Sequence, residues 1–264
     1  MSRFDYHRPN SIDDATRLRG QHEDSLFLAG GQTLLPTIKQ GLAAPSDLID
    51  LGRLDDLRGI NVSAETLTIG AMTRHAEVAA SAEARKAIPA LAHLAGLIGD
   101  PQVRNTGTLG GSLANSDPAA DYPAAVIALG ATIHTDKRSI AAEDYFLDLF
   151  ETALEPGELI VKVEFPIPKR AAYAKFPNPA SRYAIVGVMV AETKDGIRVG
   201  VTGAGPCAFR CTPIEEALAK DFSAEAVKGV AIDHSRFNSD LHASAEYRGA
   251  LVGVMAGRAV SATG

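Results

Sequence analysis

The sequence is poor in cysteine, in basic clusters and in long apolar segments, and each shortage excludes a class of protein. Two cysteines in 264 residues are too few for a disulfide scaffold and indicate a reducing compartment. A net charge of -6 without a basic block argues against a nucleic acid partner. The longest apolar run, residues 184–191, is far shorter than the roughly 20 residues of a membrane span. The first eight residues lack the apolar stretch of a secretory signal, so we expect a cytoplasmic protein without a membrane span.

Several motifs of nucleotide and metal sites are also missing. No G-x-G-x-x-G follows an expected strand and no G-x-x-x-x-G-K-[ST] occurs, which argues against Rossmann and P-loop sites. Neither H-x-x-x-H nor H-E-x-x-H is present, so we expect His75 and His93 to be packing or surface histidines and predict no metal site. Cys207 and Cys211 lack two further ligands nearby for zinc, and structural thiols are the expectation.

One stretch does carry chemistry, Asn105–Asp121, which reads N-T-G-T-L-G-G-S-L-A-N-S-D-P-A-A-D. It is too polar for a core segment and too rich in glycine for a helix. Positive φ at Gly110 and Gly111 would turn their N–H groups toward one point as an anion nest, and the hydroxyls of Thr108 and Ser112 could add donors. A helix opening at Pro118 would favour the same anion with its N-terminal end. The alternative from composition is an ordinary surface loop.

A second stretch, Leu26–Pro36, has a similar design. It reads L-F-L-A-G-G-Q-T-L-L-P, an expected strand followed by a glycine pair, two possible donors and an expected helix. Two such segments in one chain suit a ligand with two adjacent phosphates.

These two stretches carry a resemblance. A-G-G-Q-T-L-L-P at 29–36 and T-G-T-L-G-G-S-L-A-N-S-D-P-A-A-D at 106–121 resemble the pyrophosphate loops of the FAD-binding subunit of molybdenum hydroxylases, the group of carbon monoxide dehydrogenase, xanthine dehydrogenase and aldehyde oxidase relatives. The resemblance covers nearly the whole chain, from F-D-Y-H-R-P at 4–9 to H-A-S-A-E-Y-R at 242–248. It implies a two-subdomain FAD-binding fold of the vanillyl-alcohol oxidase-like type.

The resemblance also implies roles in cofactor binding for single residues. It implies no residue that acts in acid–base catalysis. Two sets would wrap the pyrophosphate, one consisting of Ala29, Gly30, Gly31, Gln32, Thr33, Leu34 and Leu35 and the other of Thr108, Gly110, Gly111 and Ser112. Asp121 would bond a ribose or ribityl hydroxyl, although a helix-dipole aspartate fits the same position. Asn115 and Asp117 lie inside the motif as cofactor contacts or helix caps.

Two further positions match the family near the flavin ring. Lys175 could stabilise a reduced, anionic ring, and the alternative is a solvated strand lysine. Tyr183 matches a position that is often aromatic and close to the isoalloxazine, and the alternative is a core tyrosine.

The remaining pattern predicts an α+β protein. We expect helices over 11–20, 33–40, 73–81, 90–98, 118–129 and 142–149, and strands over 25–29, 47–51, 66–70, 131–135 and 159–165. After Pro166 and Pro168 we expect antiparallel strands over 171–176, 186–193, 197–203 and 207–210, with a hairpin turn at 194–196, and then helices over 212–220, 223–229 and 243–259. The predicted domains are an FAD-binding domain at 1–168, with subdomains of about 1–55 and 56–168, and a C-terminal domain at 169–264 with an antiparallel sheet.

The implied function is that of an electron-transfer flavoprotein subunit. Two cysteines cannot supply the four ligands of a [2Fe–2S] cluster, so the clusters would lie on a small partner subunit and the molybdopterin on a large one. The resemblance implies a dimer of such heterotrimers. Two alternatives stay open: a stand-alone FAD-dependent oxidoreductase of the same fold, and a phosphate-binding module without a redox role.

Overall fold

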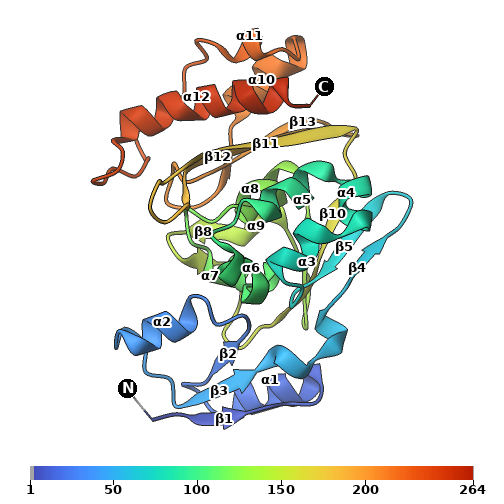
Figure 1. The fold of residues 1–264 in the computed structure, drawn as a ribbon, viewed down its shortest axis with the longest axis vertical. Helices are drawn as coiled ribbons and strands as arrows, with labels where there is room; N and C mark the ends of the chain where they lie inside the picture. Colours follow the sequence, from blue (N-terminus) through green and yellow to red (C-terminus); the bar gives the residue numbers. More distant parts are fainter. Residues whose placement is uncertain (1–2, 264) are drawn as a thin grey trace.

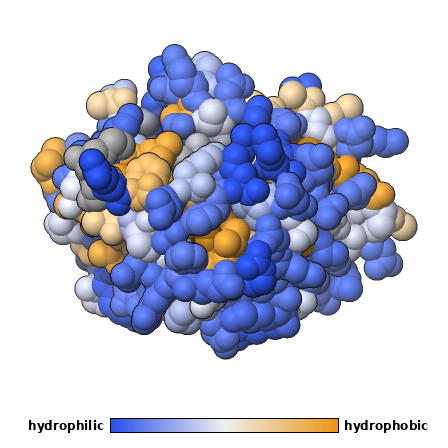
Figure 2. All heavy atoms as spheres, turned by 90° about the horizontal axis from the view of Figure 1, so that it is seen from below, coloured by the Kyte–Doolittle hydropathy of each residue, from blue (hydrophilic) through white to orange (hydrophobic). Residues whose placement is uncertain are grey.

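The structure, a computed structural model, describes residues 3–263, and its elements form three tiers along the long axis of the molecule (Figure 1). The N-terminal tier lies at the bottom of that view, the central tier in the middle and the C-terminal tier at the top. The bottom face, seen in Figure 2, is mostly hydrophilic, with its apolar residues in separate patches. No helix of residues 3–263 is long and apolar enough to cross a membrane.

The N-terminal tier is a small parallel sheet with two helices. Its strands are β1 (Asp5–His7), β2 (Leu26–Leu28) and β3 (Asp47–Asp50), in the order β1-β3-β2, and its helices are α1 (Ile12–Gln21) and α2 (Leu34–Lys39). Helix α1 begins where expected, because the Ser11 hydroxyl accepts the N–H of Asp14 at 3.0 Å. Two 3-10 turns, η1 (Leu51–Arg53) and η2 (Asp55–Leu57), lead to the central tier.

The central tier is built on a five-stranded antiparallel sheet in the order β4-β5-β10-β6-β7. The strands are β4 (Ile60–Val62), β5 (Thr66–Gly70), β6 (Thr132–Thr135), β7 (Ser139–Ala141) and β10 (Ile160–Pro166). The helices are α3 (His75–Ala80), α4 (Ala82–Ala87), α5 (Pro89–Gly96), α6 (Pro101–Thr106), α7 (Leu109–Asn115), α8 (Tyr122–Ala128) and α9 (Ala142–Tyr145), and a short hairpin joins β8 (Phe146–Asp148) to β9 (Glu151–Thr152). Strand β10 returns late in the chain to pair with both β5 and β6.

The C-terminal tier is an antiparallel meander covered on both faces. Its elements are β11 (Arg170–Pro177), β12 (Ala184–Thr193), β13 (Gly196–Thr202), β14 (Phe209–Arg210), α10 (Thr212–Lys220), α11 (Ala224–Val227) and α12 (Ala245–Ser261). In β12, Val188 and Val190 belong to the core shared with α12, whereas Met189 and Ala191 belong to the core of the central tier. Burial on both faces explains why this strand is the longest apolar run of the sequence.

The α+β class and the antiparallel C-terminal sheet are confirmed. The expected hairpin turn is also present, since Thr193 pairs with Gly196 and the loop consists of Lys194 and Asp195.

Asn105–Asp121 was expected to be too rich in glycine for a helix, and this prediction is wrong. The stretch contains the end of α6 and all of α7. Leu109 and Leu113 lie one turn apart and are fully buried, and their burial outweighs the roughly 1 kcal/mol per residue by which glycine disfavours a helix. Thr108 caps the helix by accepting the N–H of Gly111 at 3.1 Å.

Two expected helices are shorter than predicted. The helix predicted from Pro118 begins only at Tyr122, because the Pro118 carbonyl accepts the N–H of Gly203 at 2.7 Å and ties this segment to the C-terminal sheet. The helix predicted over 142–149 ends at Tyr145, because Phe146 pairs with Thr152 in the β8–β9 hairpin.

Candidate functional site

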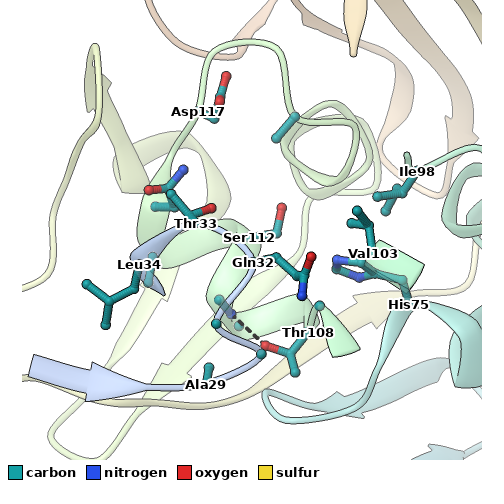
Figure 3. Close-up of a pocket in the computed structure, with 18 of the residues that line it drawn as sticks. Ala29, Gln32, Thr33, Leu34, His75, Ile98, Val103, Thr108, Ser112 and Asp117 are labelled. Atoms are coloured by element: carbon teal, nitrogen blue, oxygen red, sulfur yellow. Dashed lines mark hydrogen bonds between the residues drawn. The ribbon is translucent and has the colours of Figure 1, made fainter. Parts of the chain in front are cut away.

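A cavity of about 620 Å³ opens where the three tiers meet, within the size range of cofactor pockets. The turn after β2 and the start of α2 form one side, and the connection from α5 to α7 forms the other (Figure 3). The connection between β11 and β12 closes one end with residues 180–183. Segments far apart in the sequence therefore build one concave site.

The turn after β2 is held against the end of α6 by close backbone packing. A side chain at Gly30 would place its Cβ 2.2 Å from the Thr106 carbonyl oxygen, so only glycine fits there. Gly31 has a φ of +69°, which glycine adopts without strain. The Gln32 side chain donates a hydrogen bond to the Thr106 hydroxyl at 2.7 Å. The two glycine-rich segments are thus fixed to each other before any ligand is considered.

The amide cradle, which we define as the backbone N–H groups of residues 31–34, belongs to residues that line this cavity in the turn before α2 and at its first position. None of these four groups donates a hydrogen bond within residues 3–263. Leu34 opens α2, where the first N–H groups have no partner inside the helix and the helix dipole favours an anion, and residues 31–33 form the turn that leads into it. The cradle therefore offers donors to a negatively charged group.

The opposite wall differs from the sequence prediction. Gly110 and Gly111 lie in α7 with helical backbone, and neither has a positive φ. Their amides are already used: Gly110 donates to the Ala71 carbonyl at 2.8 Å and Gly111 to the Thr108 hydroxyl at 3.1 Å. The predicted anion nest at these two glycines is therefore wrong.

These glycines instead allow close approach. A Cβ at Gly110 would lie 2.6 Å from the Cβ of Ala71, so glycine lets α7 pack directly on the end of β5. Gly111 lines the cavity and packs beside Ala29, whose Cβ would lie 3.5 Å from a Cβ added at Gly111. Ser112 also lines the cavity, and its hydroxyl has no hydrogen-bond partner within residues 3–263. This wall contributes space and a hydroxyl rather than a row of amides.

A buried ion pair lies at the end of the cavity nearest the C-terminal tier. Asp121 accepts hydrogen bonds from the Tyr173 hydroxyl at 2.6 Å and from Lys175 Nζ at 2.9 Å. The Asp121 and Lys175 side chains are each 4% exposed. Burial raises the pKa of Asp121, and the Lys175 ammonium and the Tyr173 hydroxyl oppose that shift by stabilising the carboxylate. Lys175 is thus not a solvated strand lysine.

Comparison with known proteins decides the family. The family model described as "FAD binding domain in molybdopterin dehydrogenase" matches residues 2–168. The chain belongs to this family. It is 37% identical to the carbon monoxide dehydrogenase medium chain of Hydrogenophaga pseudoflava, over 98% of this chain and 96% of that protein. It is 35% identical to the nicotine 6-hydroxylase medium subunit of Paenarthrobacter nicotinovorans, over 94% of this chain and 92% of that protein.

Solved structures agree with this placement in the FAD-binding family. The structure of reconstituted CO dehydrogenase from Oligotropha carboxidovorans aligns with a TM-score of 0.91 at 34% identity, covering 99% of this chain and 98% of that chain. The resemblance stated from the two glycine-rich motifs is therefore confirmed.

Most of the residues that the sequence singled out lie around the cavity of this FAD-binding chain. The residues that line it are Ala29, Gly30, Gly31, Gln32, Thr33, Leu34, Thr108, Gly110, Gly111, Ser112, Asn115, Asp117, Asp121 and Tyr183. Leu35 is not among them, because it packs beneath Gly31. Lys175 is also outside the lining and reaches the cavity through Asp121.

The geometry describes the surroundings of three of these residues. Asp121 occupies the N-cap position of α8 but makes no side-chain capping bond. Tyr183 is 47% exposed and is therefore not a core tyrosine. Asp117 accepts the N–H of Ala119 at 2.8 Å and so fixes the turn before α8.

Sequence reasoning missed part of the lining, including His75, Ile98 and Val103 (Figure 3). His75 is buried beside Gly107, where an added Cβ would lie 2.7 Å from His75 Nε2. Burial lowers the pKa of His75 to about 4, so its ring is neutral at physiological pH. A lone histidine at the start of a short helix gave no signal for this position, since the packing of α3 against α5 and α6 brings it to the cavity.

Proposed function

We propose that this chain is the FAD-carrying electron-transfer subunit of a molybdenum hydroxylase. It would receive electrons from [2Fe–2S] clusters on a small partner and pass them to a final acceptor, while a large partner holds the molybdopterin and the substrate. When bound, FAD supplies the redox chemistry, and the protein holds, orients and shields it. The observation that carries the proposal is that the unpaired amides of residues 31–34 and the Ser112 hydroxyl belong to residues that line one cavity.

The residues fit the parts of FAD. Four unpaired amides in the turn that leads into α2 suit the two negative charges of a pyrophosphate, and the Ser112 hydroxyl could donate to a phosphate oxygen from the other wall. Asp121 would accept a hydrogen bond from a sugar or ribityl hydroxyl, with Lys175 keeping the carboxylate charged. Tyr183 would lie beside the isoalloxazine ring at the rim.

The cysteines support the assignment of clusters to another chain. Cys211 is buried and Cys207 is partly buried. Burial raises the pKa of both thiols, that of Cys211 to about 11, which disfavours the thiolate that a metal requires. With two cysteines in the chain against the four that a [2Fe–2S] cluster takes, the electrons would come from a partner subunit in a heterotrimer that pairs into a dimer.

A ligand series tests the site in the isolated chain. We expect FAD to bind, ADP to compete with it, and riboflavin, which lacks phosphates, to bind far more weakly. Equal affinity for riboflavin and FAD would contradict the pyrophosphate cradle. An absence of any flavin binding, with ADP still bound, would favour the phosphate-binding module instead.

A second experiment tests the subunit role. The chain is co-expressed with candidate partners, and the complex is isolated by gel filtration and assayed for flavin, iron and molybdenum. We expect the three to elute together. If the chain alone, free of metals, turns over a small substrate at enzymatic rates, the stand-alone oxidoreductase is the correct alternative.

A further inference from the structure

Three metal-ligating side chains meet in the N-terminal tier, outside the cavity. His7 ends β1, His22 follows the last turn of α1, and Asp47 begins β3. His7 Nε2 lies 2.6 Å from one oxygen of Asp47, and His22 Nδ1 lies 3.2 Å from the other. One ligand atom from each residue lies within 4.8 Å of the others, and within residues 3–263 no other group of three meets this criterion.

The fold holds each of the three residues in place. His7 is fixed by the parallel pairing of β1 with β3, which begins with the N–H of Asp5 donating to the Ser46 carbonyl at 2.9 Å. The His22 carbonyl accepts both the N–H and the hydroxyl of Ser25, at 3.0 and 2.6 Å. The backbone segments that carry the three residues are thus already fixed by the fold, so metal binding would cost little backbone conformational entropy.

The cluster has the outer support that metal sites use. The Asp47 side chain is 5% exposed, and its carboxylate accepts a hydrogen bond from the Ser46 hydroxyl at 2.6 Å. Hydrogen bonds of this kind orient a ligating carboxylate. The His7 and His22 side chains are 27% and 39% exposed, so an ion can enter from solvent and keep a water molecule in a fourth position.

We propose that His7, His22 and Asp47 bind a divalent transition-metal ion of the Zn²⁺ class. Two imidazole nitrogens and one carboxylate form a donor set that suits zinc. Ligand atoms about 2.0–2.1 Å from a tetrahedral ion lie about 3.3 Å apart. The two imidazole nitrogens contact different oxygens of Asp47, at 2.6 and 3.2 Å, and all three ligand atoms lie within 4.8 Å of one another. To reach the tetrahedral separation, these atoms must move relative to one another by at most about 1.5 Å, which the partly exposed rings can make.

The site would act on stability. An ion held by these residues joins β1, α1 and β3, and β3 pairs directly with β2, which leads into the turn at Gly30 and Gly31. Because the ion binds the folded state and not the dispersed ligands of the unfolded chain, it would raise the melting temperature. The site lies outside the cavity lining and takes no part in the redox reaction.

Cobalt provides the test, because Co²⁺ bound by nitrogen and oxygen ligands absorbs visible light and Zn²⁺ displaces it. The tag-free full chain is treated with a chelator and titrated with Co²⁺ and then with Zn²⁺. We expect saturation at one ion per chain and a melting temperature that rises with Zn²⁺. His22→Gln should weaken Co²⁺ binding by more than about 10-fold. Removing a residue that only hydrogen-bonds a metal ligand already costs about 10-fold or more in metal affinity, and His22 is itself a proposed ligand.

His93→Gln is the matched control, since His93 is an exposed histidine outside the cluster, and it should bind as the unchanged chain does. His7→Gln provides a second variant if His22→Gln fails to fold by circular dichroism. Either the absence of a saturable cobalt spectrum in the unchanged chain, or equal affinities in the unchanged chain and a folded ligand variant, would overturn the proposal and leave a hydrogen-bonded His–Asp–His cluster.

Discussion

Replacing Lys175 by methionine removes the ammonium that neutralises the buried carboxylate of Asp121. The two charged atoms lie 2.9 Å apart and each side chain is 4% exposed, so water screens the pair little. Removing one partner of a buried ion pair typically costs about 3–5 kcal/mol. Lys175 also donates to the Leu97 carbonyl at 3.0 Å, and an acceptor left without a donor adds to this cost. We expect Lys175→Met to lower the free energy of unfolding by about 3–5 kcal/mol at neutral pH.

The loss should depend on pH in a defined direction. Burial raises the pKa of Asp121 above its ordinary value of 3.8, and without Lys175 the raised pKa has less opposition. A folded state that binds the proton more readily than the unfolded state loses stability as the pH rises from the unfolded pKa through the folded pKa. The free energy of unfolding that Lys175→Met loses relative to the unchanged chain should therefore be smaller near about pH 5 than near about pH 8.

Urea unfolding of the flavin-free chain, followed by circular dichroism, measures this free energy. The double variant Lys175→Met/Asp121→Asn is the control, because it removes both charges and should recover most of the lost stability. If Lys175→Met alone lowers the free energy of unfolding by less than about 1 kcal/mol, the value typical of exposed ion pairs, the description of this pair as buried and coupled is refuted.

Three further predictions concern the cavity and its surroundings. Gly30→Ala should abolish FAD retention because its Cβ would meet the Thr106 carbonyl at 2.2 Å, whereas Gly20→Ala, which meets nothing within 4 Å, should leave the flavin content unchanged. Asp121→Asn should weaken FAD binding by about 1–3 kcal/mol, measured by calorimetry, and an unchanged dissociation constant would limit Asp121 to a structural role. The pKa of Glu158 is lowered to about 2, chiefly by its hydrogen bonds from Arg138, so its stabilising contribution is present above about pH 4.5 and is lost as the pH falls toward about 2. In Glu158→Gln the melting temperature should therefore fall less between about pH 4.5 and about pH 2 than in the unchanged chain. An equal fall in both would contradict the stabilising role assigned to the Glu158 carboxylate.

Local sequence was sufficient for the features that depend on neighbouring residues. The Ser11 cap, the loop of Lys194 and Asp195, and the start of α2 after Thr33 follow from a few adjacent side chains. The two glycine-rich segments located the cavity because much of its lining comes from two continuous stretches, residues 26–37 and 98–121. A resemblance to a known family then supplied the class of cofactor.

What the sequence could not predict depends on contacts between distant segments. Gly110 and Gly111 read as residues of positive φ, but their role is to let α7 approach Ala71 and Ala29. The buried state of Lys175 results from Asp121, 54 residues earlier in the chain. His75 likewise lines the cavity because of how its helix packs, which no local sequence pattern encodes.

The most direct test of the proposed role is reduction of this chain's flavin within the assembled enzyme. The co-purified complex is made anaerobic, its substrate is added, and the visible absorption of the flavin and of the iron–sulfur clusters is followed in a stopped-flow instrument. The proposed role predicts that the clusters and then the flavin are reduced in the complex, and that the isolated FAD-loaded chain stays oxidised with the same substrate. Clusters that become reduced while the flavin stays oxidised, or an isolated chain whose flavin is bleached by the substrate, would contradict it.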